Sequence, residues 1–248
     1  MFPYDSELLQ ALKGQPASIP EVLATMRALD ELIVDGDGLK WFNWLYMQVT
    51  GAVEERVVQG EFHDPSWLAE LDVQFAKLYF EAMANWLQGK PAPGCWTALF
   101  AQRSQSAIAR IQFSMAGMNA HINHDLALAI NETCRATKTW PRHQSTQYQD
   151  YTGVNRTLNG LVDMAKAQLM VRLRGDSLPP VSHLEETVAA WNLAAAREAA
   201  WVNAEVLWSL SATTGLSAKY LKTLDGITTV AGKALLVPVP VVIAVAGA

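Results

Sequence analysis

The residues with the clearest chemical potential lie in one short segment, GMNAHINHDLALAI, at positions 117–130. His121 and Asp125 are four residues apart and His121 and His124 are three apart, so all three side chains share one face of a helix. An imidazole and a carboxylate one turn apart can bind the same cation, or the carboxylate can fix the ring in one tautomer. We therefore expect His121, His124 and Asp125 to be catalytic. His121 and Asp125 are also the expected ligands of one divalent metal ion.

The helix that carries these residues should be polar on two sides. At 100° per residue, one third of its circumference would hold two imidazoles and two carboxylates. This stripe comprises Ser114, Gly117, His121, His124, Asp125, Leu128 and Glu132. A second polar line on the opposite side comprises Gln112, Asn119 and Asn123. The remaining positions are apolar, so the helix should be buried and its polar groups need partners, either in a functional site or in a structural network that fixes helix packing.

Several residues outside the His121–Asp125 face are candidates for contact with a ligand. Asn119, Asn123, Tyr151 and Arg197 carry polar groups that could bind a substrate, although an arginine such as Arg197 more often pairs with a nearby acidic residue. A metal ion would need a further ligand from another element, and the sequence cannot place the candidates, which are Glu54, His63 and Asp72. The nine tryptophans are expected first in the core, and only secondly around an apolar pocket.

Composition and missing motifs exclude several classes of function. A net charge of -5 argues against a nucleic-acid-binding protein, because phosphate neutralisation needs clustered Lys and Arg. No GxSxG, P-loop or GxGxxG motif opens a helix after a strand, so the usual hydrolase and nucleotide sites are not expected. Cys95 and Cys134 are 39 positions apart and are expected to be free thiols. The segment Asp35-Gly36-Asp37 is better explained as a turn that ends a helix than as a calcium loop.

Apolar residues recur at spacings of three and four, which predicts an all-α fold in a single compact domain, residues 1–248. A central helix over about 107–136 is expected to bury Met115, Leu126 and Ile130, because its middle is almost without charge. Other helices are expected over about residues 6–13, 39–59, 151–174, 184–213 and 217–236. One more helix is expected to begin at residue 19, and another to run from residue 64 or 66 to residue 88. Residues 139–150 are expected to form a loop.

The two ends of the chain bear on its location. The first residues carry Asp5 and Glu7 rather than a basic start and an apolar run, so no signal peptide is expected and the predicted compartment is the cytoplasm. The apolar tail, residues 234–248, contains Pro238 and Pro240 and is barely long enough to span a bilayer. We expect this tail to pack on the body of the protein, with no membrane partner.

Three segments of the sequence resemble a known family. They are DGLKWFNWLYMQVTGAV, LDVQFAKLYF and, above all, IQFSMAGMNAHINHDLALAI. These look like a bacterial family known only as a domain of unknown function, whose hallmark is GMNAHINHDLALA, and the resemblance covers most of the chain. It implies a compact helical domain with the His121 helix at its centre, and it supplies no reaction. The HxxxD spacing also resembles zinc-dependent phospholipase C, but five histidines are too few for that family's three-metal site.

The residues therefore predict an enzyme that acts on a small, largely apolar molecule in a helical pocket. Within this class, a hydrolase or lyase using metal-assisted or acid–base chemistry competes with a metal-free cyclase of natural-product biosynthesis. A non-catalytic protein that binds a hydrophobic ligand is the alternative from a different class. The surroundings of His121 discriminate between them, because saturated ring nitrogens would favour a structural role.

Overall fold

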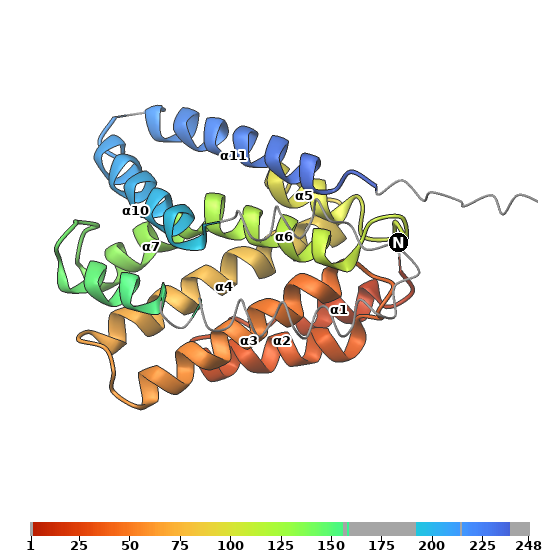
Figure 1. The fold of residues 1–248 in the computed structure, drawn as a ribbon, viewed down its shortest axis with the longest axis horizontal. Helices are drawn as coiled ribbons and strands as arrows, with labels where there is room; N and C mark the ends of the chain where they lie inside the picture. Colours follow the sequence, from red (N-terminus) through yellow and green to blue (C-terminus); the bar gives the residue numbers. More distant parts are fainter. Residues whose placement is uncertain (1, 156–157, 159–191, 214, 239–248) are drawn as a thin grey trace, which may run out of the picture.

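The computed structural model describes residues 2–155, 158, 192–213 and 215–238. Within these ranges every regular element is a helix and no strand occurs, which confirms the all-α prediction for this part of the chain. The helices run roughly along the long axis of the molecule and pack in layers (Figure 1). Within the described ranges, no helix is long and apolar enough to cross a membrane.

The first half of the chain forms five helices, and two of them begin at capping signals in the sequence. They are α1 (Asp5–Ala11), α2 (Ile19–Leu32), α3 (Leu39–Val58), α4 (Pro65–Leu87) and α5 (Gly94–Phe100). The Ser18 hydroxyl accepts a hydrogen bond from the Glu21 amide at the start of α2. Asp64 accepts one from the Trp67 amide at the start of α4. Both helices have proline in their first turn, where the missing amide costs no hydrogen bond.

The predicted central helix is present, but it is not a continuous α-helix. It consists of α6 (Arg110–Ala120), a π-helical turn η1 (His121–Asp125) and α7 (Leu126–Thr137). The Leu126 amide donates to the His121 carbonyl five residues back, which inserts one extra residue into the helix. The two histidines and the aspartate singled out from the sequence are therefore in the π turn itself.

The central helix lies between two groups of helices (Figure 1). The helices α3 and α4 pack on one side of it, and α10 (Leu193–Leu210) and α11 (Leu216–Leu235) pack on the other. Met115, Leu126 and Ile130 are all buried, as predicted. The hydrophobic stripes of this long helix therefore face partners on both sides, which explains why it carries so few charges.

The π turn changes which residues share a face with the histidines. A constant 100° per residue predicts that Glu132 shares the stripe of His121. That placement is wrong, because Glu132 is exposed and pairs with Arg135 at the surface, with 2.6 Å between Oε1 and Nη1. One inserted residue rotates everything downstream by about 100° relative to a regular α-helix, so the second carboxylate leaves the stripe.

The segment after the central helix differs from the prediction. Residues 146–155 are helical, so the helix begins before Asp150 and the predicted loop over 139–150 is shorter. Ser145 accepts from the Tyr148 amide at its start. Asp150 instead accepts from the backbone amides of His63 and Asp64, at 2.9 and 2.6 Å, and so ties this helix to the start of α4. The rest of the predicted helix 151–174, beyond 158, and the first part of 184–213 lie outside the described residues.

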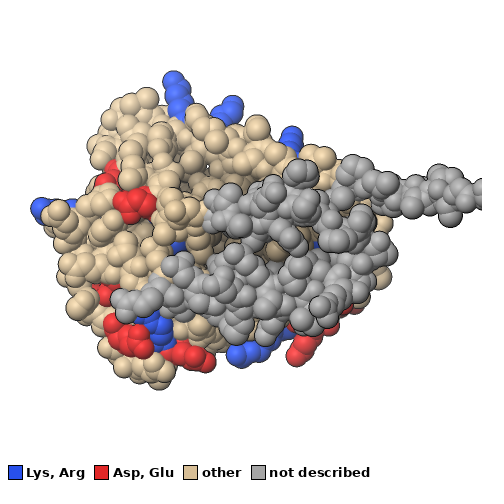
Figure 2. Space-filling model, in the orientation of Figure 1, with Lys and Arg blue, Asp and Glu red and all other residues tan. Residues whose placement is uncertain are grey.

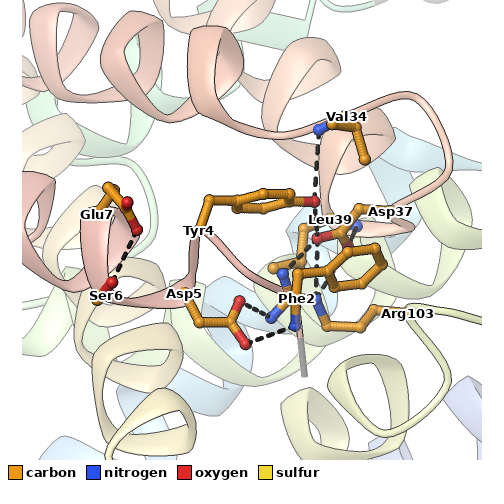
Figure 3. A network of polar contacts seen from close by, with 9 residues as sticks. All are labelled: Phe2, Tyr4, Asp5, Ser6, Glu7, Val34, Asp37, Leu39 and Arg103. Atoms are coloured by element: carbon orange, nitrogen blue, oxygen red, sulfur yellow. Dashed lines mark hydrogen bonds and ion pairs between the residues drawn. The ribbon is translucent and has the colours of Figure 1, made fainter.

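A buried polar network holds the N-terminus against the loop before α3 (Figure 3). The Arg103 guanidinium pairs with Asp37, whose side chain is fully buried, and with Asp5 at 3.0 Å. Asp37 also accepts from the Leu39 amide and from the Tyr4 hydroxyl. Asp37 therefore does close the turn after α2, as expected, but it acts through an ion pair 66 positions away in sequence.

The beginning of the C-terminal segment packs on the central helix. The Gln112 side-chain amide donates to the carbonyls of Leu235 and Val237, both at 2.8 Å, and Leu236 is buried. The predicted packing of the tail beyond residue 238 falls outside the described residues. In Figure 2, described Lys and Arg side chains project from the upper edge of the face shown, and Asp and Glu side chains lie in its left and lower parts.

Replacing Gly117 with alanine is expected to destabilise the fold by about 1–3 kcal/mol, although alanine favours helices. A Cβ atom at Gly117 would lie 2.3 Å from the Phe42 ring, so α3 and α6 could not approach as closely. Gly51→Ala is the matched control, because nothing lies within 4 Å of a Cβ there, and it should stabilise α3 by up to about 1 kcal/mol. Urea unfolding measures both. Equal effects of the two variants would contradict the close contact.

Candidate functional site

The π turn places one carboxylate between two imidazoles. Asp125 Oδ2 is 3.0 Å from Nδ1 of His121, and Asp125 Oδ1 is 2.7 Å from Nδ1 of His124. The indole N–H of Trp96, from α5, donates to Asp125 Oδ2 at 2.8 Å. Both histidines and the aspartate are buried. The structure thus brings together His121, His124 and Asp125, the three residues predicted to be catalytic, and joins them through Asp125.

The carboxylate determines the tautomer of both rings. Ionised Asp125 has only acceptors, so each Nδ1 must carry the proton in these hydrogen bonds. The remaining lone pair of each neutral imidazole is then on Nε2. Three donors surround the carboxylate, which compensates the cost of burying its charge.

Nε2 of His121 is buried and has no hydrogen-bond partner among the described residues. It lies in a cage of aromatic rings. The His121 ring stacks on Phe75, with 3.4 Å between centroids and 7° between planes. It is T-shaped against the Tyr46 ring, with 4.4 Å between centroids. The other members of this aromatic cage are Phe42, Tyr79 and Trp96, which α3, α4 and α5 supply.

Burial and hydrogen bonding act in opposite directions on the titration of the three groups. Burial lowers the pKa of His121, and the hydrogen bond that His121 donates to Asp125 only partly offsets this. Burial also disfavours the charged form of His124, but the hydrogen bond and charge of Asp125 outweigh it and raise the pKa. Burial would raise the pKa of Asp125, yet its bonds to both histidines hold the pKa below the ordinary value. The favoured state at neutral pH is an aspartate beside a neutral His121.

Two neighbouring polar groups also lack partners. The Tyr46 hydroxyl and Oδ2 of Asp72 are buried and make no hydrogen bond within the described chain. Burial, with the nearby Glu54, raises the pKa of Asp72 to about 7. Burial raises the pKa of Tyr46 well above its ordinary value, and the charge of Asp72 adds to this shift. Asp72 and Glu54, which the sequence could not place, are therefore close to each other and to the aromatic cage.

The other residues predicted to bind substrate lie in two places. The Asn119 amide donates to the Thr228 carbonyl of α11, and the Asn123 amide donates to Asn119 Oδ1, so this polar line faces α11. The Tyr151 hydroxyl donates to the Arg197 carbonyl, and Arg197 donates in return to the Tyr151 carbonyl and to Asn155. Asn119 and Asn123 are therefore bonded to each other, and so are Tyr151 and Arg197. Neither pair is bonded to the His121 ring.

Arg197 is buried, and its contacts in the described part of the chain are with neutral groups. Burial lowers the pKa of its guanidinium. An acidic partner of the kind expected from the sequence is not among the described residues.

A second group of chemically active side chains adjoins the π turn. The Cys95 Sγ, a ring nitrogen of His124 and a carboxylate oxygen of Asp225 all lie within 4.8 Å of one another. Both cysteines are free, as predicted, and both are buried. Sequence reasoning missed this group, and it also missed Trp96 and the aromatic cage, because the tryptophans were first assigned to the core. Sequence spacing gives no signal for the Cys95–His124–Asp225 group, because Cys95 and Asp225 are 130 positions apart.

The metal ligands predicted from the sequence, His121 and Asp125, face each other at hydrogen-bonding distance. The two carboxylate oxygens of Asp125 are shared among three donors. This arrangement favours Asp125 as the group that orients both rings.

Comparisons with known proteins identify the chain without assigning a reaction. No curated protein matches it, and no solved structure does. A family model matches residues 19–238, which include all the helices described above except α1. The chain belongs to a family of unknown function, DUF5995.

Proposed function

We propose that this protein is an enzyme that acts on a small, largely apolar molecule and uses His121 for acid–base catalysis. One observation carries the proposal: Nε2 of His121 is buried without a partner while Nδ1 is fixed by Asp125. A buried polar atom that makes no hydrogen bond costs free energy. A bound substrate that donates a proton to Nε2 would recover that cost.

The roles of the neighbouring residues follow from this geometry. His121 Nε2 takes a proton from the substrate, and the resulting imidazolium is stabilised by the Asp125 carboxylate 3.0 Å away. The Trp96 indole N–H donates to the same carboxylate oxygen, Oδ2, and helps to hold it in place. Asp125 is thus a positioning residue for His121. Asp72, whose pKa is raised by burial to about 7, is a candidate to return a proton to the product.

The surroundings define the class of substrate. The groups packed around the His121 ring are aromatic, which favours a substrate with an apolar body and one polar group. Hydrolysis, elimination and cyclisation all fit a single base in such a site. Their products differ in composition, since hydrolysis adds one water, elimination releases a fragment and cyclisation gives an isomer of the substrate.

His121→Gln is expected to lower turnover by about 10²–10⁴-fold, because glutamine keeps a hydrogen-bonding group but cannot accept the proton as a base. The probe is a panel of small aromatic and terpenoid alcohols, esters and epoxides, incubated with the protein and analysed by mass spectrometry. Asp125→Asn is expected to lower turnover similarly. His143→Gln is the matched control, because His143 is bonded to Glu198 and Glu205 and not to the π turn, and should leave turnover unchanged.

Two outcomes would overturn the proposal. If His121→Gln converts a panel member at the rate of the parent, His121 is not the base. If the parent binds panel members in a thermal-shift assay but converts none, the protein is a hydrophobic-ligand-binding protein. A purely structural role predicts that His121→Gln or Asp125→Asn loses about 1–3 kcal/mol of stability while the remaining folded molecules stay active.

A further inference from the structure

We propose that Cys95, His124 and Asp225 bind one divalent metal ion of the zinc class. This site lies beside the proposed base and uses neither His121 nor Asp125 as a ligand. It therefore extends the proposed function without depending on it.

The three side chains come from three different elements. Cys95 is in the first turn of α5, His124 is in η1 and Asp225 is in α11. Their ligand atoms lie within 4.8 Å of one another. A tetrahedral zinc ion at about 2.0–2.3 Å from its ligands places them roughly 3.5 Å apart, so movements of about an ångström would complete the site.

His124 is already oriented for metal binding. Its Nδ1 is held by Asp125 Oδ1 at 2.7 Å, which leaves the lone pair on Nε2 for the ion. A carboxylate on the far nitrogen is the common outer partner of metal-bound histidines, because it fixes the ring and increases its basicity. The same aspartate therefore serves both histidines of the π turn.

Asp225 is also fixed in place. Its two oxygens accept from the backbone amides of Gly94 and Cys95, both at 2.9 Å. Oδ1 also accepts from the Thr229 hydroxyl at 3.5 Å, whereas Oδ2 keeps a second lone pair for a cation. A Cβ atom at position 94 would lie 2.7 Å from Thr229 Oγ1 and 3.1 Å from Asp225, so glycine is what lets α11 approach the start of α5. The sequence thus provides close contact where the proposed ligands meet.

Burial gives the site an inside and an entrance. Cys95 and His124 are buried, whereas Asp225 is partly exposed, so an ion can enter from the Asp225 side. One sulfur, one nitrogen and one oxygen ligand suit zinc better than calcium or magnesium, which prefer oxygen. Binding requires the thiolate, so the Cys95 proton passes to solvent as the metal–sulfur bond forms. Three protein ligands leave a fourth position open, as in catalytic zinc sites.

The test is metal binding by the full chain, purified without a histidine tag. Metal analysis after zinc incubation and desalting is expected to give about one zinc per chain. Cobalt added to the metal-free protein is expected to produce a near-ultraviolet thiolate-to-metal charge-transfer band, which reports the Cys95–metal bond directly. If the parent protein retains no zinc and shows no such band, the site does not exist, whatever the variants do.

Variants assign the ligands. Cys95→Ala and Asp225→Asn are expected to lose stoichiometric zinc, and Cys95→Ala to lose the cobalt band. Asp125→Asn is expected to weaken zinc binding by about 10–100-fold, the usual effect of losing an outer partner. Cys134→Ala is the matched control, because Cys134 is the other buried free thiol and should keep both signals. Circular dichroism checks that each variant is folded.

The results separate this proposal from the proposed base. Unchanged zinc content in folded Cys95→Ala would overturn the metal site and leave the role of His121 intact. Conversely, His121→Gln should retain zinc, because His121 is not a ligand. Full zinc content with unimpaired turnover in that variant would overturn the base and leave the metal site intact.

Discussion

Replacing Arg103 with methionine is expected to lower the free energy of unfolding by about 3–5 kcal/mol, the range for removing one partner of a buried ion pair. The guanidinium is 6% exposed and Asp37 is completely buried, so the substitution leaves a carboxylate without its counter-charge in the interior. Arg103 also pairs with Asp5 and packs over the ring of Phe2 (Figure 3), so the N-terminal segment should loosen with it. Urea unfolding followed by tryptophan fluorescence measures the loss.

The matched control is Arg135→Met, which removes the cation of an exposed ion pair with Glu132. Its expected effect is below about 1 kcal/mol, because water screens such pairs. The double variant Arg103→Met with Asp37→Asn should recover part of the loss, since the fully buried side chain at position 37 then carries no charge. Equal losses for Arg103→Met and Arg135→Met would show that the buried network contributes little.

Asp72 is expected to make the protein less stable as the pH rises from about 4 to about 7. Its pKa is about 7 in the folded state, raised by burial and by Glu54, against an ordinary value of 3.8. Between these values the unfolded chain has released the proton while the folded chain still holds it, so unfolding is favoured as pH rises. A shift of this size corresponds to a loss of about 4 kcal/mol in unfolding free energy above pH 7.

Asp72→Asn removes this dependence, because an amide does not titrate. The difference in unfolding free energy between variant and parent should therefore grow in favour of the variant from pH 4 to pH 7, and then level off. Other titrating groups contribute equally to both proteins and cancel. Glu54→Gln should lower the pKa of Asp72 and so narrow the pH range over which the stability changes. A difference that does not change with pH would show that Asp72 titrates normally.

Local sequence signals predicted the helices well where a single turn of chain decides the outcome. The proline and the side-chain cap at the start of α4 are both local, and the helix begins there. The association of His121, His124 and Asp125 was also predictable, because residues one turn apart must meet on a helix. The family resemblance was confirmed over residues 19–238.

The features that escaped prediction depend on tertiary contacts. Asp150 is the last residue of the predicted loop, but it lies within a helix and accepts hydrogen bonds from the backbone amides of residues 63 and 64. The partners of Asp37 and Cys95 lie far away in sequence, so no spacing rule reaches them. The π turn has no local signature in HINHD, and its effect on Glu132 could not be foreseen from a constant angle per residue.

The π turn lets α6 and α7 present their side chains at two different rotations about the axis of the central helix. Upstream of it, the angular positions are set by contact of Gly117 with the Phe42 ring and by the direction of the His121 ring. Downstream, they are set by the burial of Leu126 and Ile130 in a different hydrophobic cluster, among α4, α7 and α10. A regular helix offers one rotation for both ends, so one set of side chains would be about 100° out of place. Because of the inserted residue, the orientation of His121 does not depend on how α7 packs. The angular positions of the side chains at the two ends of the helix can therefore change independently.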